Sequence, residues 1–360
     1  MDELGMSCVA LKDIPFATFN GFTKRLRPKN EGVIAPEYAR YYFRSWVFRS
    51  CVNSMATMST RASLNNEILS RLSISFPPLE EQQAIGTILG TLDDKIELNR
   101  KTNETLEGIA KALFKSWFVD FDPVRAKAEG RPTGLPDEIS ELFPDSLEES
   151  ELGEIPSGWE FVPLTQILQV DPKRSLPRGS VSPYLEMKAV PTSGHSADGV
   201  YFREFTSGTK FKNGDTLLAR ITPCLENGKT AMVDFLEGGQ IGWGSTEFIV
   251  LCGIRPEHNS FAYYLSRSAE FREHAIRNMV GSSGRQRVPS DALADFYLPQ
   301  APLSILNAFS SLADSLLGRI THASQENSTL SELRDALLPR LISGELRVPD
   351  SEKMLEEAGV

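Results

Sequence analysis

The sequence predicts an α+β protein in which strand-rich globular structure is combined with two long coiled-coil helices. Three observations predict this class: an internal repeat, a heptad pattern in both copies of the repeat, and a series of short apolar runs between the two heptad regions. The 360 residues suffice for two domains of ordinary size. Because 41% of the residues are hydrophobic and 24% are charged, the composition excludes a disordered or collagen-like chain.

The internal repeat emerges when the segment that starts at Arg61 is laid over the segment that starts at Arg285, 224 residues later. No gap is needed over about fifty residues, and apolar residues and prolines coincide. The matching pairs are Leu64 and Val288, Leu69 and Leu293, Leu72 and Phe296, Pro78 and Pro302, Leu79 and Leu303, Leu106 and Leu330, and Ala112-Leu113 and Ala336-Leu337. The chain is therefore expected to contain two copies of one structural unit.

In both copies, seam residues recur at alternating steps of four and three, which is a heptad pattern. The expected helices are residues 79–118 and 301–343, each roughly 40 residues and on the order of 60 Å long. Both stretches open with proline near the first turn, and Ser343-Gly344 is a stop signal for the second. The expected interface between the helices consists of Leu92, Ile96, Asn103, Leu106, Leu113, Leu316, Ile320, Asn327, Leu330 and Leu337. The alternative for such a seam is a dimerisation coiled coil.

Polar residues also occupy the seam, at Asn99, Asn103 and Asn327. A polar residue at a seam position can fix the register and orientation of the helices at a cost in stability. Because Asn99 and Asn103 lie near the middle of the first helix, we favour this role over simple exposure at a loose helix end.

The other segments follow from composition and turn signals. Residues 1–78 read as the closing part of a first strand-rich domain, 119–150 as an acidic Pro/Gly-rich connection, and 344–360 as an acidic tail. Residues 151–300 read as a complete strand-rich domain that contains the runs FVPL, DTLLAR, TAMVDFL and TEFIVLC, with turns at Asn213-Gly214, Asn227-Gly228 and Gly238-Gly239. Near its end lies a helical patch, FAYYLSRSAEFREHAIRNMV, and the first domain has a similar YARYYFRSWVFRS.

Charge and cysteine usage limit the functional classes. The formal net charge of −10 is unusual for a nucleic-acid-binding protein, but the acid is concentrated in residues 129–154 and in the C-terminal tail. The four cysteines form no C-x-x-C pair, so buried reduced thiols are expected instead of a disulfide framework or a zinc site. A signal peptide and a long apolar span are both missing from the sequence, which predicts a cytoplasmic protein without membrane association.

No enzyme signature is complete. The segment from Pro223 to Thr230 looks like a phosphate-binding loop, but proline stands where the first glycine should be, so a strand-to-strand turn is the better interpretation. The four histidines lack metal-ligand spacing, and no motif for methyl transfer is present. We therefore expect no catalytic residues, no metal and no cofactor.

Over nearly its whole length the sequence resembles the DNA-specificity (S) subunits of type I restriction-modification systems, which defend cells against foreign DNA. The resemblance rests on FPPLEEQQAIGTILGTLDDKIELNRKTNETLEGIAKALFKSWFVDFDPVRAKAEGRPTG, on LGEIPSGWE, on GDTLLARITPCLENGKTAMV and on GSTEFIVL. It implies target-recognition domains joined by two long antiparallel helices, which read a bipartite site in double-stranded DNA and hold a gap between its halves. It also implies a non-catalytic scaffold for methyltransferase (modification) subunits and a restriction subunit with translocase and nuclease activity.

The sequence departs from this family in its first recognition domain, which lacks roughly seventy residues by the repeat offset. Two alternatives stay open for this reason. One is a half-type or decayed specificity subunit that acts through self-association. The other is a helical assembly scaffold that reads no DNA.

If the chain reads DNA, arginine is the residue most often used, because its guanidinium matches the O6 and N7 atoms of guanine. The densest candidate is the loop GSSGRQRVPS, with Ser282, Ser283, Arg285, Gln286 and Arg287, and its repeat counterpart has Thr60 and Arg61. Further candidate DNA contacts are Lys173, Arg174, Arg178, Lys210, Lys212, Arg220 and Lys229. A solvated surface loop is the alternative for the first group, and Trp243 is expected in the core.

Overall fold

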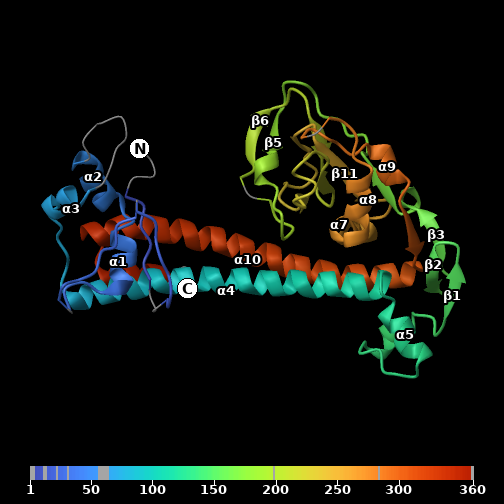
Figure 1. The fold of residues 1–360 in the computed structure, drawn as a ribbon, viewed down its shortest axis with the longest axis horizontal. Helices are drawn as coiled ribbons and strands as arrows, with labels where there is room; N and C mark the ends of the chain where they lie inside the picture. Colours follow the sequence, from blue (N-terminus) through green and yellow to red (C-terminus); the bar gives the residue numbers. More distant parts are fainter. Residues whose placement is uncertain are drawn as a thin grey trace. The chain divides into compact units, whose positions relative to one another are not determined.

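The computed structural model describes residues 5–10, 14–21, 23–30, 32–55, 65–197, 199–282 and 284–357. The chain divides into two compact units. Unit 1 comprises residues 1–100 and 325–360, and unit 2 comprises residues 101–324. Two long helices, α4 (Leu79–Phe118) and α10 (Leu303–Ser343), contribute to both units (Figure 1). Long helices and a strand-rich domain confirm the predicted α+β class.

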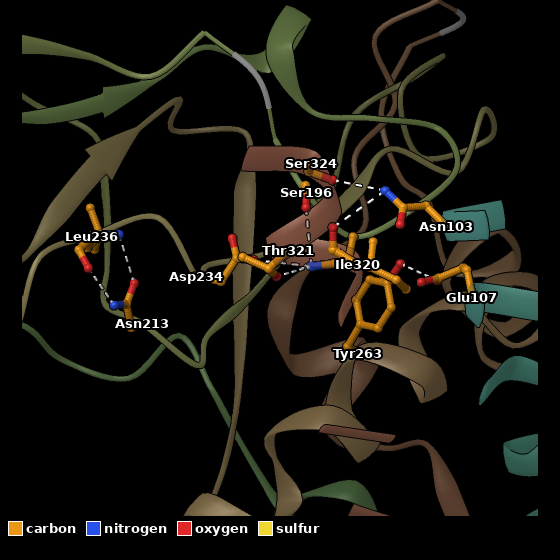
Figure 2. Close-up of polar contacts among 11 residues, drawn as sticks. Asn103, Glu107, Ser196, Asn213, Asp234, Leu236, Tyr263, Ile320, Thr321 and Ser324 are labelled. Carbon is orange, nitrogen blue, oxygen red and sulfur yellow. Dashed lines mark hydrogen bonds and ion pairs between the residues drawn. The ribbon is translucent and has the colours of Figure 1, made fainter. Parts of the chain in front are cut away.

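In each unit the two long helices run antiparallel. In unit 1, Asn99 Nδ2 donates to Asn327 Oδ1 at 3.0 Å and to Glu326 Oε2 at 2.7 Å. In unit 2, Asn103 Nδ2 donates to Ser324 Oγ at 3.1 Å and to the Ile320 carbonyl at 3.4 Å (Figure 2). Within unit 1, the partner on α10 changes from Arg334 at Asp93 to Asn327 at Asn99. Within unit 2, it changes from Ser324 at Asn103 to Phe309 at Phe114. Partner numbers fall as the numbers in α4 rise in both units, which confirms the antiparallel orientation. The seam asparagines thus pair across the helices, as a register role requires.

The expected seam residues face the interior of the helix pair. Leu92, Ile96, Leu330 and Leu337 belong to the core of unit 1. In unit 2, Leu106 and Ile320 are buried, while Leu113 and Leu316 pack against the main core. The second helix ends where predicted: Gly344 has φ +75°, and Gly344 N donates to the Leu341 carbonyl at 3.3 Å. This is the hydrogen bond of a glycine-terminated helix end.

Unit 1 packs short helices on α4 and α10. These are α1 (Pro36–Tyr42), α2 (Trp46–Met55), α3 (Asn66–Arg71) and α11 (Val348–Glu357). Helix α1 approaches α4 closely at Gly86, where an added Cβ would lie 2.8 Å from Glu37 Cβ and 3.0 Å from Tyr38 N. One helical turn earlier, the buried Gln82 side chain accepts from Ala35 N at 2.9 Å and donates to the carbonyls of Val33 and Pro77. Gly86 allows the close packing of α1, and Gln82 holds the backbone just before α1 begins.

A buried carboxylate also ties unit 1 together. Asp93 on α4 pairs with Arg40 of α1 and with Arg334 of α10, each at 2.7 Å, and it accepts a hydrogen bond from Tyr41 Oη at 2.8 Å. Burial by itself raises the pKa of Asp93, but the hydrogen bonds from Arg334 and Tyr41 and the charge of Arg40 outweigh it and hold that pKa below its usual range.

Unit 2 contains the strands, arranged in four sheets. The strands are β1 (Leu147–Ser150), β2 (Gly153–Pro156), β3 (Glu160–Pro163), β4 (Leu168–Val170), β5 (Val181–Leu185), β6 (Tyr201–Glu204), β7 (Thr209–Phe211), β8 (Thr216–Ala219), β9 (Thr230–Met232), β10 (Gly242–Gly244), β11 (Phe248–Gly253) and β12 (Tyr297–Gln300). The two larger sheets have the orders β6-β5-β10-β7 and β4-β11-β8-β9, and the two smaller ones pair β1 with β2 and β12 with β3. Only β10 and β5 pair in parallel; the other strand pairs of the described chain are antiparallel.

The sheet that contains β8 and β11 is buried on both faces. Phe248 and Val250 of β11 lie in a core with residues of the other large sheet, such as Leu185 and Phe211. The alternate residues of β11 join the main core with residues of α7 (Asn259–Arg267), α8 (Ala269–Arg277) and the long helices. Unit 2 therefore has three layers: the sheet β6-β5-β10-β7, the sheet β4-β11-β8-β9 and the helices. Helix α7 packs on the second of these sheets (Figure 1). The turns predicted at Asn213, Asn227 and Gly238 lie between strands as expected.

Buried polar contacts fasten this strand-rich domain to the helix pair within unit 2 (Figure 2). Tyr263 Oη on α7 donates to Glu107 Oε1 on α4 at 2.6 Å. His195 Nε2 lies 3.1 Å from both Asp234 Oδ2 and Thr321 Oγ1, and the Thr321 hydroxyl donates to the same Asp234 oxygen at 2.7 Å. Thr321 belongs to α10, so each long helix has its own polar contact with the domain.

The repeat extends further than the aligned sequence. Shifting α1, α2 and α3 by 224 residues brings them onto α7, α8 and α9 (Ser290–Ala294) to within two residues. The segments predicted as an acidic connection and an acidic tail contain regular structure: α5 (Asp122–Ala128), α6 (Asp137–Ser140) and β1 lie in the connection, and α11 lies in the tail. Phe121 separates α4 from α5, and Gly344 separates α10 from α11, each with a left-handed backbone conformation. The chain changes direction there, so the heptad pattern of the long helix does not continue into the short one.

Candidate nucleic-acid interface

The predicted loop around Arg285 is held by backbone hydrogen bonds on both sides. Val280 and Arg287 exchange two backbone hydrogen bonds of 2.9 Å, which close the loop as a short hairpin. Gln286 N donates to Thr222 Oγ1 at 2.8 Å, and Thr222 N donates to the Gln286 carbonyl at 3.0 Å. The loop is thus bonded to the segment that follows β8 through Gln286, and Arg285 is followed by backbone that is positioned before any ligand binds.

The two arginines of the loop differ in their surroundings. Arg287 is engaged by Glu247: its Nε lies 3.0 and 2.9 Å from the two carboxylate oxygens, and its Nη2 lies 2.7 Å from Oε1. The hydrogen bonds and charge of Arg287 lower the pKa of Glu247. Arg285 is exposed, and no side-chain partner for it occurs among the described residues. Among the described loop residues, Arg285 is therefore the cation without a side-chain partner, and Arg287 is held in place by Glu247.

The other loop positions are partly accessible. Ser282 is exposed and accepts a hydrogen bond from Arg285 N at 3.0 Å through its carbonyl, while Gln286 is half-buried. Ser283 lies outside the described residues, as do Thr60 and Arg61 in the repeat counterpart.

Several predicted cations have structural partners. Arg174 forms a buried ion pair with Asp215, whose Oδ2 lies 2.9 Å from Arg174 Nε. Lys229 Nζ donates to the carbonyls of Met187 and Lys188 at 2.7 and 3.2 Å. Its ammonium group therefore binds a backbone turn of the protein and not a phosphate. Burial raises the pKa of Asp215, whereas its contacts with Lys212 N and Arg174 lower it and leave it above its usual range. Sequence reasoning had no signal for these pairings, because the partners are distant in the chain.

The remaining predicted cations are more available. Lys173, Arg178 and Lys212 are exposed. Lys210 is half-buried, with Nζ 5.0 Å from the centre of the Phe205 ring and 3.3 Å from the Arg174 carbonyl. Arg220 is also half-buried, and its backbone joins two segments: its N–H donates to the Glu247 carbonyl, and its carbonyl accepts from Val288 N, both at 2.9 Å.

Two arginines that the sequence pattern did not single out have central roles in the domain. Arg267 donates to the carbonyls of Thr192, Gly194, Gly228 and Thr230 and thereby joins two loops and the start of β9 to α7. Arg203 lies over the rings of Tyr184 and Trp243 at 4.8 and 5.6 Å. Trp243 itself is buried, as predicted.

The structure corrects the expectation for the cysteines and places the histidines. All four thiols are free, but only Cys252 is buried; Cys8 is exposed, and Cys51 and Cys224 are half-buried. Among the described residues, no group of three or more potential ligands could hold a metal ion. Three histidines bond protein groups instead, His195 as above, His258 at the Ile167 carbonyl and His274 at the Ala292 carbonyl. Within the described chain no helix is long and apolar enough to cross a bilayer.

Comparison with known proteins identifies the family. Residues 5–108 match the family model described as the type I restriction modification DNA specificity domain. The HindI type I restriction enzyme specificity subunit of Haemophilus influenzae is 30% identical over 338 residues, which cover 77% of this chain and 70% of that protein. The chain belongs to the family of type I restriction enzyme specificity subunits.

Other relatives of this specificity subunit support the same family assignment. The MjaIX specificity subunit of Methanocaldococcus jannaschii is 28% identical over 360 residues, which cover 95% of this chain and 76% of that protein. The crystal structure of the type I S subunit from M. genitalium matches with a TM-score of 0.51 at 15% identity over 86% of this chain and 73% of that one, which supports the fold. Family membership also confirms that the chain is a non-catalytic specificity subunit.

Proposed function

We propose that unit 2 carries a sequence-reading target-recognition domain, residues 151–300, whose base contacts centre on Arg285. The observation that carries this assignment is the contrast within one loop: Glu247 holds Arg287 in place, while Arg285 is exposed and unpaired among the described residues. A guanidinium with free donors on a positioned backbone is suited to the two acceptors of guanine. Ser282 and Gln286 add hydrogen-bonding groups beside it.

The scaffold role follows from the helices. We propose that the antiparallel pair spaces the halves of a bipartite DNA site and, with its outer faces, binds the methyltransferase subunits and a restriction subunit. In unit 2 both helices contact the recognition domain through buried polar groups, so the orientation of the domain is set by the pair. This arrangement suits a protein that must present a reading surface at a defined angle to its partners.

The test compares DNA binding of wild-type and Arg285→Ala protein, each in complex with its partner subunits. The target is the duplex sequence that the wild-type complex enriches from a randomised pool, and the reference is a scrambled duplex. Loss of one base contact is expected to weaken binding to the enriched duplex by about 1–3 kcal/mol while binding to the scrambled duplex changes much less.

Arg277→Ala is the matched control, because Arg277 is an exposed arginine on α8 that pairs with Glu273. It removes the same charge and is expected to leave both affinities unchanged. Equal weakening on both duplexes by Arg285→Ala would assign the residue to phosphate contact. No change for either Arg285→Ala or Arg287→Ala would show that the loop is a solvated surface feature.

A further inference from the structure

A shallow depression lies beside the Arg285 loop, on the segment to which that loop is bonded. Its lining includes Lys210, Arg220, Thr209, Thr246 and Asp171. Arg220 joins it to the loop, since Val288 N donates to the Arg220 carbonyl and the next residue, Ile221, forms a β-bridge with Arg287. The depression and the candidate base-reading arginine are therefore carried by neighbouring backbone segments.

The depression holds a cationic donor that has no acceptor. The Nε atom of Arg220 is buried and has no hydrogen-bond partner among the described residues. Burying a charged N–H group without an acceptor is unfavourable, because the group loses its water and gains no bond in exchange. The Nε atom itself has almost no accessible surface, so an anion in the depression would contact Arg220 through the accessible part of its half-buried side chain.

The carboxylates near the depression are already engaged. Asp215 pairs with Arg174, and Glu247 pairs with Arg287 through both of its oxygens. Asp171 accepts hydrogen bonds from Val250 N at 2.9 Å and from Ser290 Oγ. In the described part of the chain no carboxylate forms an ion pair with Lys210 or Arg220. Lys210 Nζ donates to the Arg174 carbonyl at 3.3 Å, and the charge of Arg220 contributes to the lowered pKa of Glu247. Both cations line the depression without a direct ion pair of their own.

We propose that this depression is a phosphate-binding subsite that receives a backbone phosphodiester of the DNA next to the base read by Arg285. The proposal rests on the proposed function of the loop and adds the sequence-independent half of the contact. Arginine and lysine are the usual donors to phosphate oxygens, and such contacts fix the protein on the duplex without reading its sequence. Arg220 and Arg285 then have separate roles, one in affinity and one in discrimination.

The test uses Arg220→Gln in the partner-bound complex, titrated against the enriched duplex and the scrambled duplex at several salt concentrations. Both affinities are expected to fall by the same factor, about three- to tenfold at low salt, and the slope of log K against log salt is expected to decrease by about 0.9 for one lost phosphate contact. Arg277→Gln is the matched control and should leave both quantities unchanged. A duplex with a single methylphosphonate at the contacted position should bind wild-type and Arg220→Gln protein equally.

Each other outcome overturns the subsite. Unchanged affinities and an unchanged salt slope would remove it, and a loss confined to the enriched duplex would make Arg220 a base reader. If inorganic phosphate raises the thermal unfolding midpoint of wild-type but not of Arg220→Gln protein, while DNA binding is unaffected, the site serves a free anion and not a duplex. If Arg220→Gln fails to fold, the same test is made with Lys210→Gln, by measuring its affinities for the two duplexes and its salt slope. Failure of the proposed function is detected separately, because it would leave the affinity of Arg285→Ala for both duplexes unchanged.

Discussion

The close approach of α1 to α4 at Gly86 predicts both the direction and the size of the stability change in Gly86→Ala. In Gly86→Ala, the new Cβ would lie 2.8 Å from Glu37 Cβ and 3.0 Å from both Glu37 C and Tyr38 N. Two of these atoms belong to the backbone and cannot rotate away, so α1 must retreat by about half an ångström, together with the buried Tyr38, Tyr41 and Tyr42.

The expected magnitude combines two opposing effects. Overpacking of this kind costs about 1–3 kcal/mol, while replacing glycine by alanine inside a helix gains about 1 kcal/mol. The net expectation for Gly86→Ala is a loss of about 1 kcal/mol in the free energy of unfolding. Gly90 lies one turn further along α4 and has no atom within 4 Å of its virtual Cβ, so Gly90→Ala is expected to gain up to about 1 kcal/mol.

Urea unfolding followed by far-ultraviolet circular dichroism measures both variants, and hydrogen exchange of the α1 amides locates the effect. Gly86→Ala should speed exchange in α1, whereas Gly90→Ala should not. If Gly86→Ala proved as stable as Gly90→Ala, the packing of α1 on α4 described above would be wrong.

Two further predictions concern buried polar groups. The low pKa of Asp93 in the folded state means that its contribution to stability is present above the unfolded value of about 3.9 and is lost as the pH falls through the folded pKa. Asp93→Asn should therefore lower the free energy of unfolding by about 2 kcal/mol at pH 7, and the gap to wild type should narrow near pH 3; a gap that does not depend on pH would contradict this. Tyr263→Phe removes the donor to Glu107 and the acceptor of Arg267 Nε, which lies 2.8 Å away, and should cost about 1.5–3 kcal/mol in chemical denaturation. In a Glu107→Leu background only the loss of the Arg267 contact remains, so the cost should fall by about 1 kcal/mol. Additive losses in that double-mutant cycle would argue against the contact.

Local pattern determined the regular parts of this protein. The heptad spacing predicted both long helices, because a seam residue must recur every 3.5 positions to stay on the face that meets the partner helix. Turn signals at Asn213-Gly214 and Asn227-Gly228 placed strand boundaries correctly, since these residues favour backbone conformations that reverse the chain. Family resemblance supplied the antiparallel orientation, which heptad spacing alone does not encode.

Only the tertiary structure distinguished the cations from one another. In the sequence, Arg285 and Arg287 are two similar residues of one loop, and Arg174 and Lys229 are equally plausible phosphate ligands. The fold brings Glu247 to Arg287, Asp215 to Arg174 and two backbone carbonyls to Lys229. It leaves Arg285 exposed, and Arg220 Nε has no acceptor among the residues that the structure describes. These partners lie 40 or more residues away along the chain, so whether each charge is neutralised or free is decided by packing and not by sequence pattern.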